Sequence, residues 1–244
     1  MRPENPAACA LFLDLDGTLI DIALTPQGVL IPDGLASLLA ELTRTLDGAL
    51  AIVTGRPIAD VDRFLAPLTP VAAGVHGAEL RTTPRGEITL TAAPIDPALV
   101  AAVSTLAATE AGVVVETKRA SVAVHYRLAP SAEAKIEAAL QQLLDDGPDH
   151  LILCRGRKVF EIVPRHVSKG AALETLLALP TFRGRRPVMI GDDTSDLSAF
   201  AAAAGHGGYG LKVAGEHFSG AEAFFSGPAA VRGWLATLSR CLAT

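Results

Sequence analysis

Short uncharged runs of apolar residues alternate with helix-spaced leucines along the first part of the chain. Each run ends at a polar or glycine-containing turn, which predicts three strands buried on both faces: Ala10–Leu13, Ala49–Val53 and Val71–Val75. Apolar residues three and four apart predict two helices between them: Gly34–Leu46, with Asp33 as its N-cap, and Ile58–Leu65. This order of elements predicts a parallel sheet with crossover helices.

The pattern changes near Arg81 and changes back at Val167. Strand-like segments in this region are Glu87–Thr91, Gly112–Lys118, Ser121–Arg127, His150–Arg155 and Lys158–Val163. Two predicted helices, Pro97–Glu110 and Ala132–Asp145, interrupt them. Helix, two strands, helix, two strands indicates an antiparallel sheet with helices on one face, an α+β unit (αββαββ) inserted in the first domain.

From Val167 the α/β pattern resumes. The remaining predicted elements are a helix from Ser168 to Leu179, a strand at Pro187–Ile190, and helices at Asp196–Ala203 and Ala229–Leu242. The expected fold class is therefore α/β, with a parallel-sheet core formed by residues 1–80 and 167–244 and an inserted α+β domain at residues 81–166.

Composition narrows the function classes. The 244 residues include 50% hydrophobic and 19% charged residues, which is typical of a globular protein. A net charge of -5, scattered basic residues and 5% aromatic residues argue against a nucleic-acid partner. The three cysteines, Cys9, Cys154 and Cys241, are far apart, and no apolar run reaches membrane-spanning length. We therefore expect a cytoplasmic protein without a membrane partner or a signal peptide.

Two acids, Asp14 and Asp16, follow the first predicted strand directly. Residues two apart on an extended chain point to the same side, and Gly17 allows a sharp turn after them. Two neighbouring carboxylates need a proton or a cation between them, so the pair suits a divalent metal beside a nucleophile. The alternative for an isolated D-x-D-G is a turn cap; a calcium loop fits less well, because Gly17 follows the second acid directly.

Polar residues follow four segments that end at the same edge of the predicted sheet. They are Asp14/Asp16, Thr54-Gly55-Arg56, His76-Gly77 and Asp192/Asp193. Ligands of open parallel sheets collect at the carboxyl ends of the strands. Three carboxylates (Asp14, Asp16, Asp192), the Thr54 hydroxyl and Lys169 at a helix start suit phosphoryl transfer with Mg²⁺. A nucleotide P-loop motif is absent from the sequence.

These segments resemble a known family. DLDGTL, TGR, a lysine at a helix start and GDDTSD resemble the four motifs of the haloacid dehalogenase (HAD) superfamily of phosphatases, and the insert resembles its C2-type cap. More narrowly, TGR, VHGAE, ETKRASVAVHYR, FEIVPRHVSKGAAL and GDDTSDLSAF resemble the trehalose-6-phosphate phosphatases. The resemblance covers most of the chain and implies a HAD-like Rossmannoid core with a substrate-specificity cap.

The resemblance also implies roles for the core residues. Asp14 would attack phosphorus and form an aspartyl phosphate, while Asp16 would protonate the leaving sugar oxygen and then accept a proton from water. Mg²⁺ would be held by Asp14, the backbone carbonyl of Asp16, and Asp192. Thr54 and Lys169 would hold the phosphoryl oxygens, and Asp193 and Asp196 would support the metal site.

The insert carries a polar face. Period-two spacing places Glu116 with Lys118 on one strand, Ser121 with His125 and Arg127 on the next, and Glu161 on a third. From the residues alone, a solvated surface with cross-strand ion pairs is the base expectation. The family resemblance instead implies that Glu116, Lys118 and Glu161 bind the glucose unit remote from the phosphate.

Residues on the core rim complete the substrate-binding set. His76, flanked by glycine, is expected to contact substrate, together with Gly55 and Gly77. Arg56 and Arg127 could contact phosphate or sugar, or could be helix-end and surface partners.

The expected activity is hydrolysis of trehalose 6-phosphate to trehalose and phosphate. We expect a monomeric Mg²⁺-dependent enzyme whose cap closes over the sugar and excludes water. One departure from the family pattern is Leu197, where the family has Glu. It could signal a shifted substrate, so a phosphatase of sucrose phosphate or of a glycosyl-phosphoglycerate is the alternative. A non-catalytic sugar-phosphate sensor is a third possibility, although all the catalytic acids are present.

Overall fold

The computed structural model describes residues 8–23 and 28–242. Contacts divide the chain into two compact units, one from the residues up to Thr89 together with those from Ser168 onward, and a second from Leu90 to Val167. The second unit thus begins at Leu90, whereas the change of sequence pattern near Arg81 placed its start at residue 81.

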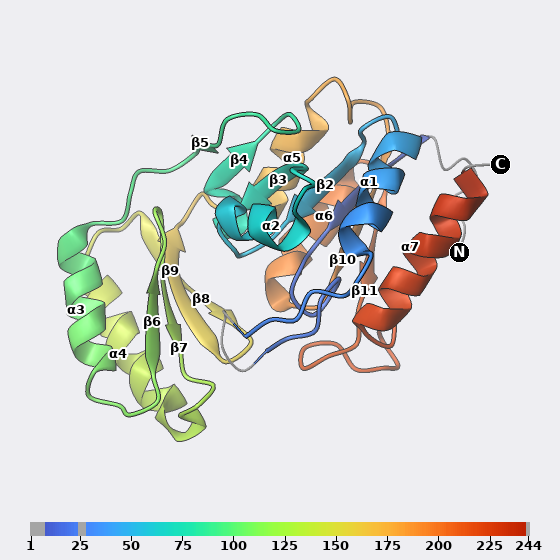
Figure 1. The fold of residues 1–244 in the computed structure, drawn as a ribbon. Helices are drawn as coiled ribbons and strands as arrows, with labels where there is room; N and C mark the ends of the chain where they lie inside the picture. Colours follow the sequence, from blue (N-terminus) through green and yellow to red (C-terminus); the bar gives the residue numbers. More distant parts are fainter. Residues whose placement is uncertain (1–7, 24–27, 243–244) are drawn as a thin grey trace. The chain divides into compact units, whose positions relative to one another are not determined.

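The first unit is built on a seven-stranded sheet with the order β11-β10-β1-β2-β3-β4-β5 (Figure 1). Its parallel strands are β1 (Cys9–Leu13), β2 (Leu50–Val53), β3 (Val71–Gly74), β10 (Arg186–Gly191) and β11 (Tyr209–Lys212). The predicted parallel sheet is confirmed. All residues of β1, β2 and β3 are buried, as expected for strands covered on both faces.

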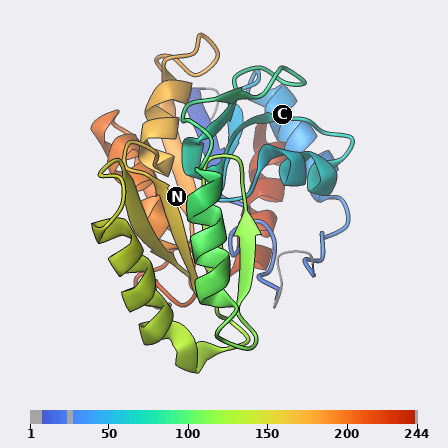
Figure 2. The ribbon, with the colours of Figure 1, turned by 90° about the vertical axis from the view of Figure 1, so that its left-hand side faces the viewer.

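Helices cover both faces of this sheet. They are α1 (Leu35–Thr45), α2 (Ile58–Leu65), α5 (Lys169–Leu177), α6 (Leu197–Gly205) and α7 (Pro228–Leu242). Figures 1 and 2 show α5 and α6 on one face and α1, α2 and α7 on the other. The leucines of α1, among them Leu35, Leu39 and Leu42, lie in the core, as their helical spacing predicted.

Two local predictions for the first unit are wrong. Asp33 does not cap α1, because Gly34 occupies the N-cap position in the left-handed region at φ 76°, and among the described residues no side-chain hydrogen bond caps this end. The segment Glu87–Thr91, expected in the inserted sheet, instead contributes β5 (Thr89–Leu90), which lies beside β4 (Glu79–Arg81) at the edge of the core sheet. Because β4 runs antiparallel to β3, the edge of the sheet is antiparallel.

The second unit has the predicted order of elements. It contains α3 (Pro97–Ala107), β6 (Val114–Thr117), β7 (Val122–His125), α4 (Glu133–Asp145), β8 (Leu151–Gly156) and β9 (Val159–Pro164). The four strands form an antiparallel sheet with the order β6-β7-β9-β8. Val122, Val124 and Phe160 pack with residues of α3 and α4 in a separate apolar core, so the helices cover one face of this sheet.

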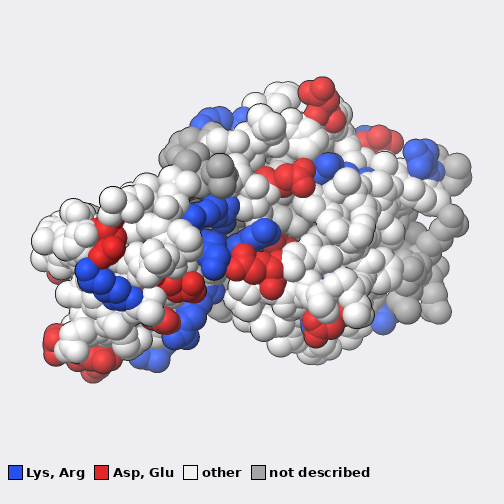
Figure 3. Space-filling model, turned by 90° about the horizontal axis from the view of Figure 1, so that it is seen from below, with Lys and Arg blue, Asp and Glu red and all other residues white. Residues whose placement is uncertain are grey.

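Charged side chains of both signs are exposed on one face of the molecule. On the face in Figure 3, Lys and Arg side chains lie among Asp and Glu side chains, with larger uncharged areas between them. Within the described ranges, no helix combines the length and apolar character that a bilayer crossing requires.

Candidate active site

The carboxyl end of β1 carries Asp14 and Asp16 in two different environments. Asp14 follows the strand directly, donates its backbone N–H to the Ile190 carbonyl at 3.0 Å, and is 3% exposed. The side chain of Asp16 is 30% exposed. Because the extended strand ends at Leu13, the period-two rule no longer governs the chain here, and the two carboxylates have different partners.

Asp14 belongs to a buried acidic cluster with Asp192 and Asp196. Oxygen atoms of these three carboxylates lie within 4.8 Å of one another. Asp192 follows β10, and Asp196 ends the short 3₁₀ helix η4 (Thr194–Asp196). The Nζ atom of Lys169 donates to Asp14 Oδ1 at 2.8 Å and to Asp196 Oδ1 at 2.7 Å, so one ammonium group bridges two of the three carboxylates.

The start of α5 positions Lys169. Ser168 is the N-cap, and its side-chain oxygen accepts the Ala171 N–H at 3.0 Å. Lys169 is the first residue of the helix and is only 3% exposed, so its ammonium group lies inside the protein beside the acids. A lysine in this position neutralises negative charge as a compact point charge.

The pKa values of the cluster reflect its burial and its charge balance. Burial raises the pKa of Asp14 to about 7, despite the opposing charge of Lys169. Burial and the negative charges of Asp14 and Asp196 raise the pKa of Asp192 to about 9. The pKa of Lys169 is also raised, because the neighbouring carboxylates outweigh its own burial. The cluster therefore has an excess of negative charge that a divalent cation would balance.

Asp193 and Asp196 shape the loop after β10. The Asp193 side chain accepts the Thr194 N–H at 2.6 Å, while Asp196 Oδ2 accepts the Asp193 N–H at 2.9 Å, which together form a capping box. Asp193 Oδ1 also lies 3.1 Å from Nε2 of His217, a histidine to which the sequence assigned no role. Leu197 begins α6 and is 47% exposed.

Gly17 makes the approach of Asp192 possible. Its φ of 76° lies in the left-handed region, and a Cβ atom there would lie 2.0 Å from Asp192 Oδ2. Thr18 adds a hydroxyl 3.4 Å from Asp192 Oδ1. The glycine after the two acids therefore serves both the turn and the packing of the cluster.

Arg56 contacts the second acid. Its Nε atom donates to Asp16 Oδ2 and its Nη2 atom donates to Asp16 Oδ1, both at 2.6 Å. The sequence left Arg56 as a phosphate or sugar contact or as a helix-end or surface partner; in the structure its partner is an acid on the site rim.

Thr54 follows β2 and is 1% exposed, and its hydroxyl accepts the Arg56 backbone N–H at 3.2 Å.

His76 lies in an unusual turn. Val75 and His76 both have positive φ, 48° and 56°, inside the 3₁₀ segment η2 (Val75–Gly77). This conformation is strained for a β-branched residue, and strained backbone concentrates at functional sites. A Cβ atom on Gly55 would lie 2.8 Å from the His76 ring, so the glycine leaves space for the imidazole. No sequence signal indicated a left-handed valine.

The second unit gathers the predicted polar residues on one face of its sheet. Lys118 Nζ lies 2.9 Å from Glu161 Oε1, and the Ser121 hydroxyl donates to the same oxygen at 2.5 Å. His125 Nε2 lies 2.8 Å from Glu116 Oε2. The Lys118 and Glu161 side chains are each only 7% exposed, so this pair is not the solvated surface pair that composition alone favoured.

Three further observations describe this face. Burial raises the pKa of Glu116, but the His125 hydrogen bond and the Lys118 charge outweigh this effect and hold the pKa below its usual value. Cys154 stands opposite Glu161 in the strand register, and its burial and the Glu161 charge raise the pKa of the thiol to about 11. Arg127 donates to the Arg157 backbone carbonyl at 2.9 Å.

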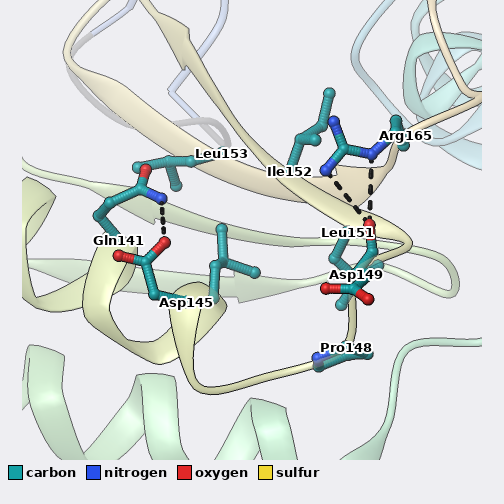
Figure 4. A pocket seen from close by; sticks show the side chains of 9 residues that line it. Gln141, Asp145, Pro148, Asp149, Leu151, Ile152, Leu153 and Arg165 are labelled. Atoms are coloured by element: carbon teal, nitrogen blue, oxygen red, sulfur yellow. Dashed lines mark hydrogen bonds between the residues drawn. The ribbon is translucent and has the colours of Figure 1, made fainter.

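A hollow of about 480 Å³ lies elsewhere in the second unit (Figure 4). Residues of α4, β8 and the loop joining them line it, together with Arg165, which donates to the Asp149 carbonyl. None of the predicted catalytic or sugar-binding residues contributes to its lining. Its volume alone does not make it the site of the chemistry.

Comparison with known proteins identifies relatives over most of the chain. A sequence profile described as trehalose-phosphatase matches residues 12–223. A probable trehalose-phosphate phosphatase of Sinorhizobium fredii (strain NBRC 101917 / NGR234) is 41% identical over 234 residues, covering 94% of this chain and 87% of that protein. The trehalose-6-phosphate phosphatase of Escherichia coli (strain K12) is 37% identical over 213 residues, covering 86% and 79%.

A solved structure supports the fold independently. The C-terminal domain of Candida albicans trehalose-6-phosphate phosphatase superposes with a TM-score of 0.83, covering 96% of this chain and 93% of that one. Its sequence is 20% identical, so this likeness concerns the fold alone.

Proposed function

The chain belongs to the trehalose-phosphatase family, and from this premise we propose that it hydrolyses trehalose 6-phosphate to trehalose and inorganic phosphate. The predicted HAD-type fold is confirmed by the structural likeness. The observation that carries the chemistry is the buried cluster of Asp14, Asp192 and Asp196, in which the Lys169 ammonium group contacts Asp14 and Asp196. This arrangement supplies a nucleophile, a cation for phosphoryl oxygens and acids for a metal ion.

In the first step, an Asp14 oxygen attacks phosphorus as the bond from phosphorus to the sugar oxygen breaks. Asp16 gives its proton to that sugar oxygen, so trehalose leaves as a neutral alcohol and an aspartyl phosphate remains. The two acids suit separate tasks because Asp14 is buried beside Lys169, whereas Asp16 lies on the more open rim.

In the second step, water attacks the phosphorus of the aspartyl phosphate. Asp16 accepts the proton that the water loses, and inorganic phosphate leaves with the Asp14 carboxylate restored. Lys169 and the Thr54 hydroxyl would contact phosphoryl oxygens in both steps.

The donor set fits Mg²⁺, which prefers carboxylate and carbonyl oxygens. We propose that Asp14, Asp192 and the backbone carbonyl of Asp16 hold the ion. Asp196 suits a supporting role, because Lys169 already donates to its Oδ1 and the Asp193 N–H to its Oδ2. When bound, Mg²⁺ would neutralise charge on the phosphoryl group.

Sugar recognition is assigned to the second unit. Glu116, Lys118 and Glu161, with Ser121 and His125, offer carboxylates, an ammonium group, a hydroxyl and an imidazole on one sheet face. Such groups form strong hydrogen bonds with sugar hydroxyls. If the Lys118–Glu161 ion pair exchanged its contact for hydrogen bonds to the sugar, each buried charge would still have a partner. Gly55, His76 and Gly77 remain proposed substrate contacts of the core, and Arg127 of the second unit. A monomeric cytoplasmic protein also stays a prediction.

Phosphate release from a substrate panel tests the proposal. Wild-type protein with Mg²⁺ should hydrolyse trehalose 6-phosphate faster than sucrose 6-phosphate, glucosyl-3-phosphoglycerate and glucose 6-phosphate, and a chelator should stop the reaction. Asp14→Asn should abolish turnover, whereas Asp33→Asn, which removes an exposed carboxylate outside the cluster, should keep it. Equal turnover of the whole panel would refute the trehalose assignment.

A further inference from the structure

Asp16 is held on the site rim by a bidentate contact with Arg56. Both guanidinium donors reach the carboxylate at 2.6 Å, one to each oxygen. Resting on the proposed phosphatase function, we propose that Arg56 is a positioning residue that fixes the Asp16 carboxylate for proton transfer to the leaving oxygen. Each carboxylate oxygen has two lone-pair sites, so the contact leaves one on each oxygen for the transferred proton.

The guanidinium group itself is fixed by two neighbours on α2. Its Nη1 atom lies 3.7 Å from Asp60 Oδ2, and its carbon atom lies 4.9 Å from the centre of the Phe64 ring. A planar group held at its edge by carboxylates and at its face by an aromatic ring has little freedom to rotate. The Arg56 side chain is correspondingly only 12% exposed.

The backbone that carries Arg56 is also anchored. Its carbonyl accepts the N–H of the strained residue Val75 at 2.9 Å, and its N–H donates to the Thr54 hydroxyl at 3.2 Å. Two residues later, the buried carboxylate of Glu79 accepts the Ile58 N–H at 2.8 Å and caps the start of α2. The backbone from which the Arg56 side chain reaches Asp16 is therefore held in place.

The geometry distinguishes this role from general phosphate binding. An arginine that only attracts phosphate would act equally on every phosphate ester. An arginine that acts through Asp16 should instead affect the rate most for esters whose leaving oxygen needs a proton. An alkyl oxygen, as in a sugar, requires protonation, whereas a nitrophenolate leaves as a stable anion.

The test compares Arg56→Lys with wild type on trehalose 6-phosphate and on p-nitrophenyl phosphate. Lysine keeps the charge but cannot make the bidentate contact. We expect kcat/KM for trehalose 6-phosphate to fall about 10–100-fold, a part of the roughly 100–10,000-fold that general acid catalysis contributes, and kcat/KM for the nitrophenyl ester to fall by less than about 3-fold. The ratio kcat/KM is the right readout because it reports only the steps up to and including departure of the leaving group.

Arg63→Lys is the matched control. Arg63 lies on α2, pairs with the same Asp60 at 2.8 Å and stacks over the same Phe64 ring at 4.7 Å, but its side chain is 57% exposed. It should leave both kcat/KM values unchanged. A second test combines Arg56→Lys with Asp16→Asn: if Arg56 acts through Asp16, the double variant should be no slower on trehalose 6-phosphate than Asp16→Asn alone.

Equal losses on both esters, or losses that multiply in the double variant, would overturn the positioning role. If trehalose 6-phosphate is not the substrate, wild-type protein will fail on it first. The comparison then runs on whichever alkyl phosphate the wild type hydrolyses, so the two failures can be told apart.

Discussion

At the scale of single residues, Gly17 shows how closely local backbone and chemistry are joined. Its left-handed conformation turns the chain after the two acids, and its missing Cβ leaves the space that Asp192 fills. Gly34 has the same φ of 76°, but nothing lies within 4 Å of a Cβ added there. The two glycines therefore separate the cost of backbone strain from the cost of crowding the acidic cluster.

Gly17→Ala should lower both stability and activity. Strain at positive φ costs about 1 kcal/mol, and displacement of Asp192 should add to this and weaken Mg²⁺ binding. Denaturant unfolding and the Mg²⁺ concentration needed for half-maximal phosphate release would measure the two effects.

Gly34→Ala is the control for this prediction. It should show the loss of about 1 kcal/mol in the free energy of unfolding and an unchanged Mg²⁺ requirement. A normal Mg²⁺ requirement in Gly17→Ala would contradict the crowding argument.

At the scale of elements, the N-terminus of α5 connects helix stability with the position of Lys169. Ser168→Ala removes the side chain that accepts the Ala171 N–H, which should cost about 1 kcal/mol of stability. Because Lys169 is the next residue, fraying of this turn should also lower kcat. Thermal unfolding and steady-state kinetics measure both, and Ser168→Thr, which keeps the hydroxyl, should restore them. An unaffected Ser168→Ala protein would mean that packing alone fixes this turn.

Elements and their order followed well from the sequence, because apolar runs and helical spacing report directly on burial. The edge of the core sheet did not: the three residues of β4 and the two of β5 are too short for a periodic signal. The Asp33 cap failed because Gly34 could take the left-handed conformation.

Part of the candidate active site could also be predicted from the sequence. Asp14, Asp192 and Lys169 come together as the sheet topology indicated. The Arg56–Asp16 contact and the positive φ of Val75 were not predictable, since both depend on how distant segments pack.

At the scale of the whole molecule, the acidic cluster affects stability as well as chemistry. The pKa values of about 7 for Asp14 and about 9 for Asp192 exceed the ordinary aspartate value of 3.8, so the folded chain retains protons that the unfolded chain has lost. At these two groups the native state then binds more protons, so their contribution to the free energy of unfolding of the metal-free protein falls as pH rises above about 4. Mg²⁺, which binds the native state, should offset this loss.

The melting temperature in chelator should therefore fall between pH 6 and pH 8, and the gain from added Mg²⁺ should grow over the same interval. Asp192→Asn should raise the melting temperature of the metal-free protein at pH 8 by a few degrees and abolish the gain from Mg²⁺. Calorimetric scans with and without Mg²⁺ would measure this.

Asp33→Asn, outside the cluster, should behave as wild type in these scans. A gain from Mg²⁺ that survives in Asp192→Asn would show that the ion binds elsewhere.

The half-buried thiol of Cys154, opposite Glu161, and the exposed thiol of Cys241 make selective chemical labelling possible. Cys9 is buried, and the raised pKa of Cys154 leaves almost no thiolate at neutral pH, whereas Cys241 is exposed near the end of α7. One equivalent of a maleimide dye at pH 7 should therefore modify Cys241, as peptide mass spectrometry would show. A fluorophore could be attached to the native sequence without engineering and without touching the strands proposed to bind sugar.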